Sequence, residues 1–212
     1  MIIDLHTHTY PTSDDSRLTP DELISEAKRI GLDGICITDH DGFWKPKDIE
    51  KLADKYKFTV LPGCEVTTEE GHLLVYGLKK YIFGMHKASF VKKLIDKENG
   101  AIVVAHPYRR NYSEYRDINE VNYKKMLNKA SKNPVFKLSD AIEEFNGKGS
   151  KKENKFSSDL TKKLKMNGTG ASDAHQIEHI GTFATEFFNP IQNIKDLIRE
   201  IKSGNFRSVK LK

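Results

Sequence analysis

The sequence has little cysteine and no long hydrophobic run. Two cysteines in 212 residues exclude a disulfide framework and suit a reducing compartment. The longest apolar runs, Ile35–Ile37 and Ala101–Ala105, fall far below the roughly 18 residues of a membrane span. The first residues show no basic segment followed by an apolar stretch, so we expect no secretory signal. These absences predict a cytoplasmic protein that has no membrane partner.

Internal repeats, low-complexity tracts and Pro/Gly-rich linkers are absent as well. A typical domain has about 150 residues, and the hydrophobic residues, 37% of this sequence, suffice for one sizeable core. We therefore expect a single domain over residues 1–212, with core motifs in 4–185 and a closing helix and strand in 190–212. The loosest stretch, 147–152, is expected to be a loop, because a domain boundary there would split the motifs described below.

The net charge says less about function than the positions of the histidines do. Lysine and arginine number 35 and aspartate and glutamate 30, for a formal net charge of +5. The charged residues make up 31% of the chain and are well mixed, so the basic excess only mildly favours anionic partners such as nucleic acid. The eight histidines are more informative because of where they stand.

Short apolar runs alternate with amphipathic helical segments along most of the chain. Thr19, Pro20 and Glu22 form a helix start, with Gly31 as its end. The alternation predicts an α/β protein with a mostly parallel sheet, open or closed. We expect strands at 2–5, 34–38, 59–62, 72–78, 101–105, 141–145, 169–172, 181–186 and 207–210, and helices at 19–31, 46–56, 86–98, 121–130, 155–166 and 194–202.

Metal-ligating residues follow one predicted strand after another. His6 and His8 are two apart, so a strand would direct both to the same side. Further imidazoles and carboxylates stand at the later strand ends: His40, Glu65, His72, His106, Asp173 and His175. Active sites of parallel α/β proteins lie at the carboxyl ends of the strands, and imidazole and carboxylate together suit zinc, iron or manganese. The pattern predicts a buried site for several metal ions.

These motifs, in this order, resemble the polymerase and histidinol phosphatase (PHP) domain family. The resemblance covers Asp4 to Thr185 and rests on DLHTHT, ITDHD, PGCEVTT with GHLLVYG, VVAHPYR, and GASDAH followed by GTFAT. The stretch YPTSDDSRLTPDELI is similar to the small phosphoesterase branch of the family. The resemblance implies a distorted (β/α)7 barrel that holds its metal ions at the carboxyl ends of the strands.

The resemblance also implies three divalent ions, manganese, iron or zinc, with nine ligands. It assigns His6, His8, Glu65 and Asp173 to a first ion. Glu65 would bridge to a second ion, which also takes His72 and His106, and a third would take Asp14, His40 and His175. Asp15 stands beside Asp14 and is the alternative ligand. His86 and His179 match no motif and are expected to be bystanders, and Cys36 and Cys64 are expected to pack near the strand ends.

Three divalent ions and three carboxylates would leave a local charge of about +3, which favours a phosphate ligand. Bound metals lower the pKa of water to about 7. Arg109 is placed to bind a phosphate through its planar guanidinium, and Asp39 or Asp41 could orient His40. The segment from Tyr108 to Arg116 interleaves aromatic residues with arginines, which suits either a nucleotide contact or a mobile surface lid.

The predicted function is metal-dependent hydrolysis of phosphate esters, with phosphorylated small molecules, nucleotides or oligonucleotide ends as substrates. A histidinol-phosphate phosphatase is the alternative within the same chemistry. From a different class, the chain could be a non-catalytic metal-binding module in a DNA-processing assembly. Such modules tend to lose ligands, whereas all nine positions are occupied here, so we favour an enzyme and expect no obligate protein partner.

Overall fold

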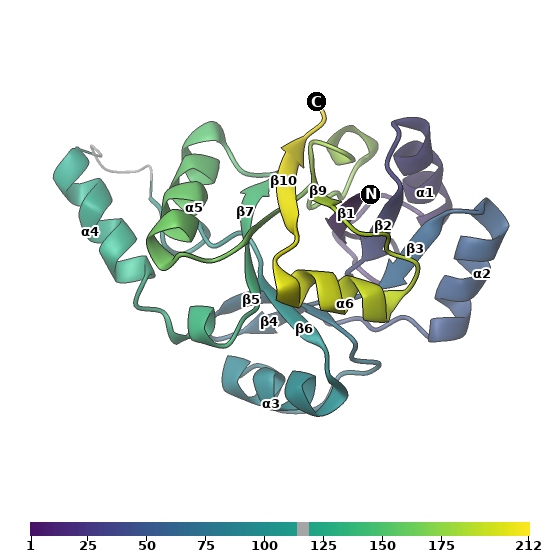
Figure 1. The fold of residues 1–212 in the computed structure, drawn as a ribbon, viewed down its shortest axis with the longest axis horizontal. Coiled ribbons are helices and arrows are strands. Elements are labelled where there is room, and N and C mark those ends of the chain that lie inside the picture. Colours follow the sequence, from purple (N-terminus) through teal and green to yellow (C-terminus); the bar gives the residue numbers. More distant parts are fainter. Residues whose placement is uncertain (114–118) are drawn as a thin grey trace.

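The computed structural model describes residues 1–113 and 119–212 (Figure 1). Within these ranges the chain forms six α-helices: α1 (Pro20–Arg29), α2 (Pro46–Tyr56), α3 (Ala88–Glu98), α4 (Glu120–Ala130), α5 (Lys151–Leu164) and α6 (Ile194–Ser203). The same ranges contain ten strands: β1 (Ile2–Thr7), β2 (Gly34–Ile37), β3 (Thr59–Pro62), β4 (Cys64–Thr68), β5 (Gly71–Tyr76), β6 (Ala101–Val104), β7 (Ala141–Asn146), β8 (Gly168–Ala171), β9 (Phe183–Phe187) and β10 (Phe206–Lys210). In the described part of the chain, no helix has both the length and the apolarity to cross a bilayer.

The strands form two mixed sheets, with the orders β10-β9-β1-β2-β3 and β4-β5-β6-β7-β8. The α/β class is confirmed, but the prediction of a mostly parallel sheet is wrong. β4 was not expected as a strand, and only Glu69 and Glu70 separate it from β5, which is too short for a parallel crossover. The two strands therefore pair antiparallel. No closed barrel is found among the described residues, so the (β/α)7 barrel stays unconfirmed.

The two sheets are joined at the ends of their strands. Isolated bridges link Thr7 to Ala174 and His40 to Glu65, each connecting one sheet to the other. The Thr185 hydroxyl accepts from the Gly170 amide at 3.1 Å and donates to its carbonyl at 2.8 Å, which ties β9 to β8. These contacts bring the polar ends of β1, β2, β4 and β8 to one place.

Apolar side chains fill the space between the sheets and cover their outer faces. Leu5, Tyr76 and Val103 lie in the central cluster, and α6 packs Leu197 and Ile201 onto it. A second cluster places α1 and α2 on the outer face of β1–β3, and a third places α3, α4 and α5 on the outer face of β4–β7. Figure 1 shows α1 and α2 on one side of the strands and α4 and α5 on the other. Both cysteines are buried, Cys36 between the sheets and Cys64 in the cluster beneath α3.

Local capping explains where two helices begin. Thr19 caps α1 as predicted, since its side chain accepts from the Glu22 amide while the Glu22 carboxylate accepts from the Thr19 amide. α5 begins at Lys151, earlier than predicted, because Ser150 and Glu153 form the same reciprocal box. The segment 147–152 is therefore a short turn followed directly by a helix.

β1 is irregular where it carries the first of the predicted ligands. The register of β1 against β2 shifts between Asp4 and Thr7, so ordinary ladder bonds are interrupted there. Side-chain hydroxyls bond to the backbone of β1 instead. The Thr38 hydroxyl accepts from the Thr7 amide at 3.1 Å, and the hydroxyl of the buried Tyr76 donates to the Leu5 carbonyl at 2.8 Å. The irregular stretch directly precedes His8 and contains His6, and such bulges re-aim side chains near functional sites.

We predict that Tyr76→Phe destabilises the protein by about 1 kcal/mol, because it removes one buried hydrogen bond and leaves packing nearly unchanged. The free energy of unfolding from urea titrations measures the change. Tyr81→Phe is the matched control, since Tyr81 is exposed and should be neutral. Equal stability of wild type and Tyr76→Phe would show that the bond to Leu5 contributes nothing.

Candidate metal centre

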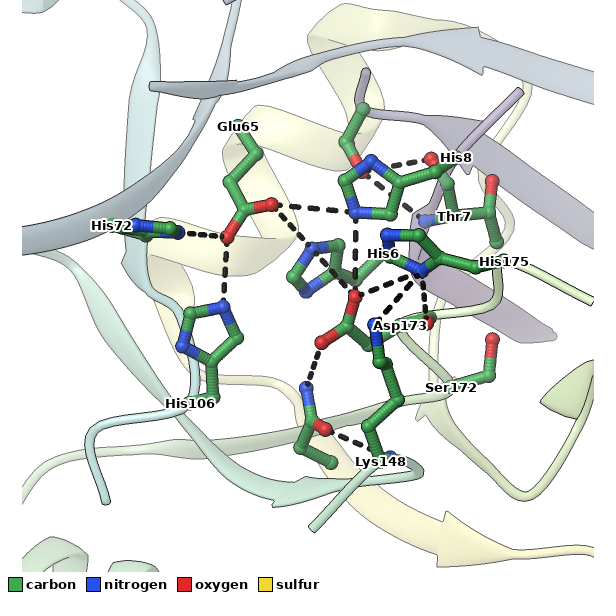
Figure 2. A network of polar contacts seen from close by, with 12 residues as sticks. His6, Thr7, His8, Glu65, His72, His106, Lys148, Ser172, Asp173 and His175 are labelled. Carbon is green, nitrogen blue, oxygen red and sulfur yellow. Dashed lines mark hydrogen bonds and ion pairs between the residues drawn. The ribbon is translucent and has the colours of Figure 1, made fainter. Parts of the chain in front are cut away.

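Eight of the nine predicted ligands lie within one cluster at the strand ends, and Figure 2 shows all of them except His40. They come from β1, β4 and β5 and from the segments that follow β1, β2, β6 and β8. The eight residues are His6, His8, His40, Glu65, His72, His106, Asp173 and His175. The structure thus brings them together as the sequence predicted, while their role as metal ligands remains a prediction.

Glu65 lies at the centre of the cluster and is fully buried. Its Oε1 lies 2.8 Å from His72 Nδ1 and 2.7 Å from His106 Nε2. Its Oε2 lies 3.2 Å from His6 Nε2 and 3.3 Å from His8 Nε2. Figure 2 shows the carboxylate between the two pairs of imidazoles. This placement suits a carboxylate that bridges two cations.

Asp173 completes the group around His6 and His8. Its Oδ1 lies 3.3 Å from His8 Nε2 and 3.6 Å from His6 Nε2. Ligand atoms held tetrahedrally at about 2.1 Å from one ion are about 3.4 Å apart. The measured separations of 3.2 to 3.6 Å among these nitrogen and oxygen atoms therefore match the edges of one metal site.

Five buried polar atoms of the cluster have no hydrogen-bond partner among the described residues. They are His6 Nε2, His8 Nε2, Glu65 Oε2, Asp173 Oδ1 and His175 Nε2. A buried polar atom without a partner costs about 1–3 kcal/mol, and more when it is charged. Because all five belong to one cluster, cations are the partners that would satisfy them together. The residues present therefore fit the implied metal ions.

The third predicted group contains Asp15 in place of Asp14. Asp15 Oδ2 lies 3.0 Å from His175 Nε2 and 3.4 Å from His40 Nε2, although the side chain is 51% exposed. Asp14 is an exposed residue of the same turn. Of the two neighbours, Asp15 is the one that contacts both histidines, so we propose Asp15 as the carboxylate ligand of this group.

The electrostatics of the cluster show an excess of negative charge around the imidazoles. Burial by itself would lower the pKa of His6, but the carboxylates of Asp173 and Glu65 raise it well above its usual value. Burial likewise opposes ionisation of Glu65, yet His6 and its neighbours hold the pKa of that carboxyl well below its usual range. Without a bound cation, a proton on His6 thus offsets part of the negative charge of these carboxylates.

His175 and His106 behave differently from His6. Burial, together with the nearby His8, lowers the pKa of His175 to about 4, so this imidazole is neutral at pH 7. Its Nδ1 lies 2.8 Å from the Asp173 carbonyl, and a proton donated there leaves the Nε2 lone pair facing Asp15. Burial also lowers the pKa of His106. Neutral imidazole is the form that binds metal.

Glu143, on β7, supports two of the predicted ligands and was not predicted. Its Oε1 lies 3.0 Å from His6 Nδ1, so a proton donated there directs His6 Nε2 toward Glu65. Its Oε2 accepts from the His106 amide at 2.6 Å and from Asn146 Nδ2 at 2.9 Å. Buried carboxylates of this kind orient metal-binding histidines. The sequence did hold a clue to this role, because Glu143 and Glu144 are charged residues inside the predicted strand 141–145.

Asp39 and Asp41 do not orient the His40 ring as predicted. Asp39 accepts from the Thr9 amide at 2.5 Å, from Ser13 Oγ at 2.8 Å and from Trp44 Nε1 at 2.7 Å. Ser13 Oγ in turn lies 3.2 Å from His8 Nδ1, so Asp39 acts on His8 through Ser13.

Asp41 likewise accepts a hydrogen bond from a backbone amide. It is exposed and accepts from the Thr67 amide at 3.1 Å. The predicted catalytic role of Asp39 and Asp41 stays a prediction, while their contacts place both carboxylates on neighbouring backbone and side-chain donors.

Arg109 points into the cluster as predicted. Its Nη2 donates to Asp173 Oδ2 at 2.8 Å, and its Nη1 lies 3.0 Å from His106 Nε2. The side chain remains 36% exposed, so it can also face a ligand in solution. His106 and Asp173 both have positive φ, 25° and 54°, a backbone conformation that is uncommon for non-glycine residues.

The aromatic residues near Arg109 do not form an exposed stacking surface in the described part of the loop. Tyr108 is buried and its hydroxyl donates to Asn146, while Tyr112 packs 5.4 Å from the ring of Phe156. Tyr115 and Arg116, which completed the predicted pattern, lie outside the described residues. His86 and His179 lie outside the groups of possible ligands, as expected.

Known proteins match parts of this chain. A family model described as PHP-associated matches residues 151–206. An error-prone DNA polymerase of Nocardia farcinica is 34% identical over 64 residues, 30% of this chain and 6% of the polymerase. An uncharacterized protein of Methanocaldococcus jannaschii is 29% identical over 119 residues, 51% of this chain and 68% of that protein. The chain thus spans a small part of the polymerase and about two thirds of the archaeal protein.

Among solved structures, a two-domain protein from Bacteroides vulgatus contains a predicted PHP-like metal-dependent phosphoesterase. It superposes with a TM-score of 0.66 at 17% identity, over 99% of this chain and 64% of that chain. This chain therefore shares the α/β fold of that protein, and the cluster described above lies at the ends of its strands. The resemblance to the PHP family that the motifs predicted is confirmed by these matches.

We predict that metal removal lowers the thermal midpoint and that metal affinity falls as the pH falls. Below the raised pKa of His6 its proton competes with the cation, so loading must release protons. Titration calorimetry with Zn²⁺ or Mn²⁺ in buffers of different ionisation enthalpy measures this release. Affinity that stays constant or rises as the pH falls would contradict the proposed role of His6.

Asp15→Asn and Asp14→Asn distinguish the two neighbouring candidates. Asp15→Asn should lose about one bound ion per chain, or bind it at least tenfold more weakly, because it removes a charged ligand. Asp14→Asn should retain wild-type metal content. Elemental analysis after dialysis against a weak chelator gives the stoichiometry. Metal loss confined to Asp14→Asn would restore the original assignment.

Proposed function

We propose that this protein is a metal-dependent phosphoesterase that hydrolyses phosphate esters, including nucleotides or oligonucleotide ends. The observation that carries the proposal is the set of five unpartnered polar atoms, buried together around Glu65 and Asp173. Three divalent ions at these residues would exceed the charge of the three carboxylates Glu65, Asp173 and Asp15. A site with this positive excess favours a phosphate group.

The ligand assignments follow the contacts described above. His6, His8, Glu65 and Asp173 would hold one ion. Glu65, His72 and His106 would hold a second, and Asp15, His40 and His175 a third. When bound, such ions supply Lewis acidity that activates water and polarises phosphate oxygens. The identity of the metal is left open by the donor set, which suits manganese, iron and zinc.

A pocket of about 490 Å³ provides an approach to this centre. His72, His106 and Arg109 line it next to the cluster, and Arg110 and Phe136 line it farther out. Arg109 offers a planar pair of N–H groups beside Asp173, which suits two oxygens of one phosphate. We assign Arg109 to binding and orienting the phosphate, and Glu143 to holding His6 and the His106 backbone in place.

A non-catalytic role in a DNA-processing assembly is the second candidate, because the chain matches an error-prone DNA polymerase over 64 residues. The cluster supports metal binding in either candidate, because a non-catalytic metal-binding module would keep the same buried donor atoms. We favour catalysis because Arg109 and an open pocket also stand beside the cluster. Hydrolysis assays separate the two candidates directly.

The proposal predicts metal-dependent hydrolysis of an aryl phosphate, an aryl phosphodiester or a nucleotide by the Mn²⁺- or Zn²⁺-loaded protein. Asp173→Asn should reduce kcat by at least about a hundredfold, because it removes a ligand carboxylate. Arg109→Ala should mainly raise KM. Steady-state kinetics with and without EDTA are the measurement. No metal-dependent turnover on the full set of substrates would refute the enzyme and leave the non-catalytic module.

A further inference from the structure

A second cleft, of about 810 Å³, lies between α5 and the β9–β10 edge, and none of its described lining residues is a proposed metal ligand. Figure 1 shows α5 and β10 as neighbours, with β7 between them. Glu144 of β7 contacts a lining residue on each side of the cleft: it accepts from Ser158 of α5 at 2.7 Å and lies 3.5 Å from Ser208 Oγ of β10. These bonds fix the spacing of the two walls. The volume falls within the range of about 300–1,000 Å³ that is typical of ligand sites.

The lining of the cleft includes a pair of aromatic rings. The pairing of β7 with β8 shifts register between Glu143 and Phe145. Glu143 faces the metal cluster, whereas Phe145, two residues on, lines the cleft, so this bulge reverses the ordinary alternation of the strand. Phe145 stacks on Phe183 of β9 with centroids 5.4 Å apart and an interplanar angle of 16°. Both rings are only partly buried, which leaves aromatic surface for a ligand.

The walls of the cleft carry an excess of positive charge. Lys151, Lys155 and Lys162 stand along α5, and Lys210 and Lys212 stand at the end of β10. Asp159 also lines the cleft but is already paired with Lys155 and accepts from a tyrosine hydroxyl. Rows of lysine on both sides of an aromatic surface suit a ligand that combines flat rings with a repeated negative charge.

A short turn separates the cleft from the metal cluster. Gly147 and Gly149 line the cleft, while Lys148 between them has its Nζ 3.4 Å from His175 Nδ1. The turn needs glycine, because a Cβ on Gly147 would lie 2.4 Å from the Ser172 carbonyl oxygen. One ligand could therefore reach from the cluster, past Lys148, into the cleft.

We propose that this cleft binds a single-stranded oligonucleotide segment attached to the phosphate that occupies the metal centre. Bases would stack on Phe145 and Phe183 while the lysines neutralise the backbone, the combination that sequence-independent single-strand sites use. The inference rests on the proposed phosphoesterase function for the position of the terminal phosphate. It extends that function by giving the substrate a second binding region outside the cluster.

Equilibrium binding of a labelled, nuclease-resistant phosphorothioate hexathymidylate to the metal-loaded protein tests the proposal. Lys151→Glu with Lys155→Glu should weaken binding by about tenfold or more, and added salt should weaken wild-type binding steeply. Phe183→Leu should weaken binding severalfold, because it keeps an apolar side chain but removes the stacking face. Thermal unfolding checks that each variant is folded.

Lys93→Glu with Lys97→Glu is the matched control, because these exposed lysines have the same spacing on α3, outside the cleft. Its hexathymidylate affinity should equal that of the wild type. Equal losses in control and cleft variants, or wild-type binding no tighter than that of a dinucleotide, would overturn the proposal. Tighter binding of anionic vesicles than of the hexathymidylate would also overturn it. Because binding needs no turnover, absence of hydrolysis is a separate result that bears on the phosphoesterase alone.

Discussion

The cost of burying unpaired polar atoms is the constraint on which this structure depends. His6, His8, Glu65 and Asp173 are almost fully excluded from solvent, yet the atoms that they direct at one another lack hydrogen-bond partners in the described part of the chain. Supporting contacts hold them in this unfavourable arrangement, most directly the Glu143 carboxylate behind His6. In the proposed metal centre cations would become the partners of these atoms, so their binding would also stabilise the fold.

The grouping of the candidate ligands was easier to predict from the sequence than the strand pairing. The grouping follows from local residue patterns, whereas the pairing depends on contacts between residues far apart in the chain. His6 and His8 could be placed together from strand alternation alone, and His106 and His175 from their positions after apolar runs. The pairing of strands depends instead on loop length and on contacts made far along the chain. The hairpin of β4 and β5 was missed because residues 64–68 mix threonine, valine and glutamate with no clear boundary before Gly71.

The remaining misses concern side chains whose direction is set by their surroundings. Asp14 and Asp15 are adjacent and chemically identical, and only the folded turn shows that Asp15 contacts His40 and His175. Asp39 lies next to His40 in the sequence but reaches His8 through Ser13. Local patterns give the type of residue at such a position, whereas its partner is chosen by tertiary packing.

The bridge between Thr7 and Ala174 has a consequence for how the protein is made. It joins residues 167 positions apart, and the Ser172 amide donates to Asp4 over nearly the same distance in the chain. Contacts of such long range form late and slow the folding of a domain. During synthesis the first histidines leave the ribosome well before Asp173 and His175, so a growing chain holds only part of the donor set. The proposed metal centre can therefore be complete only after residues 173–175 have been synthesised.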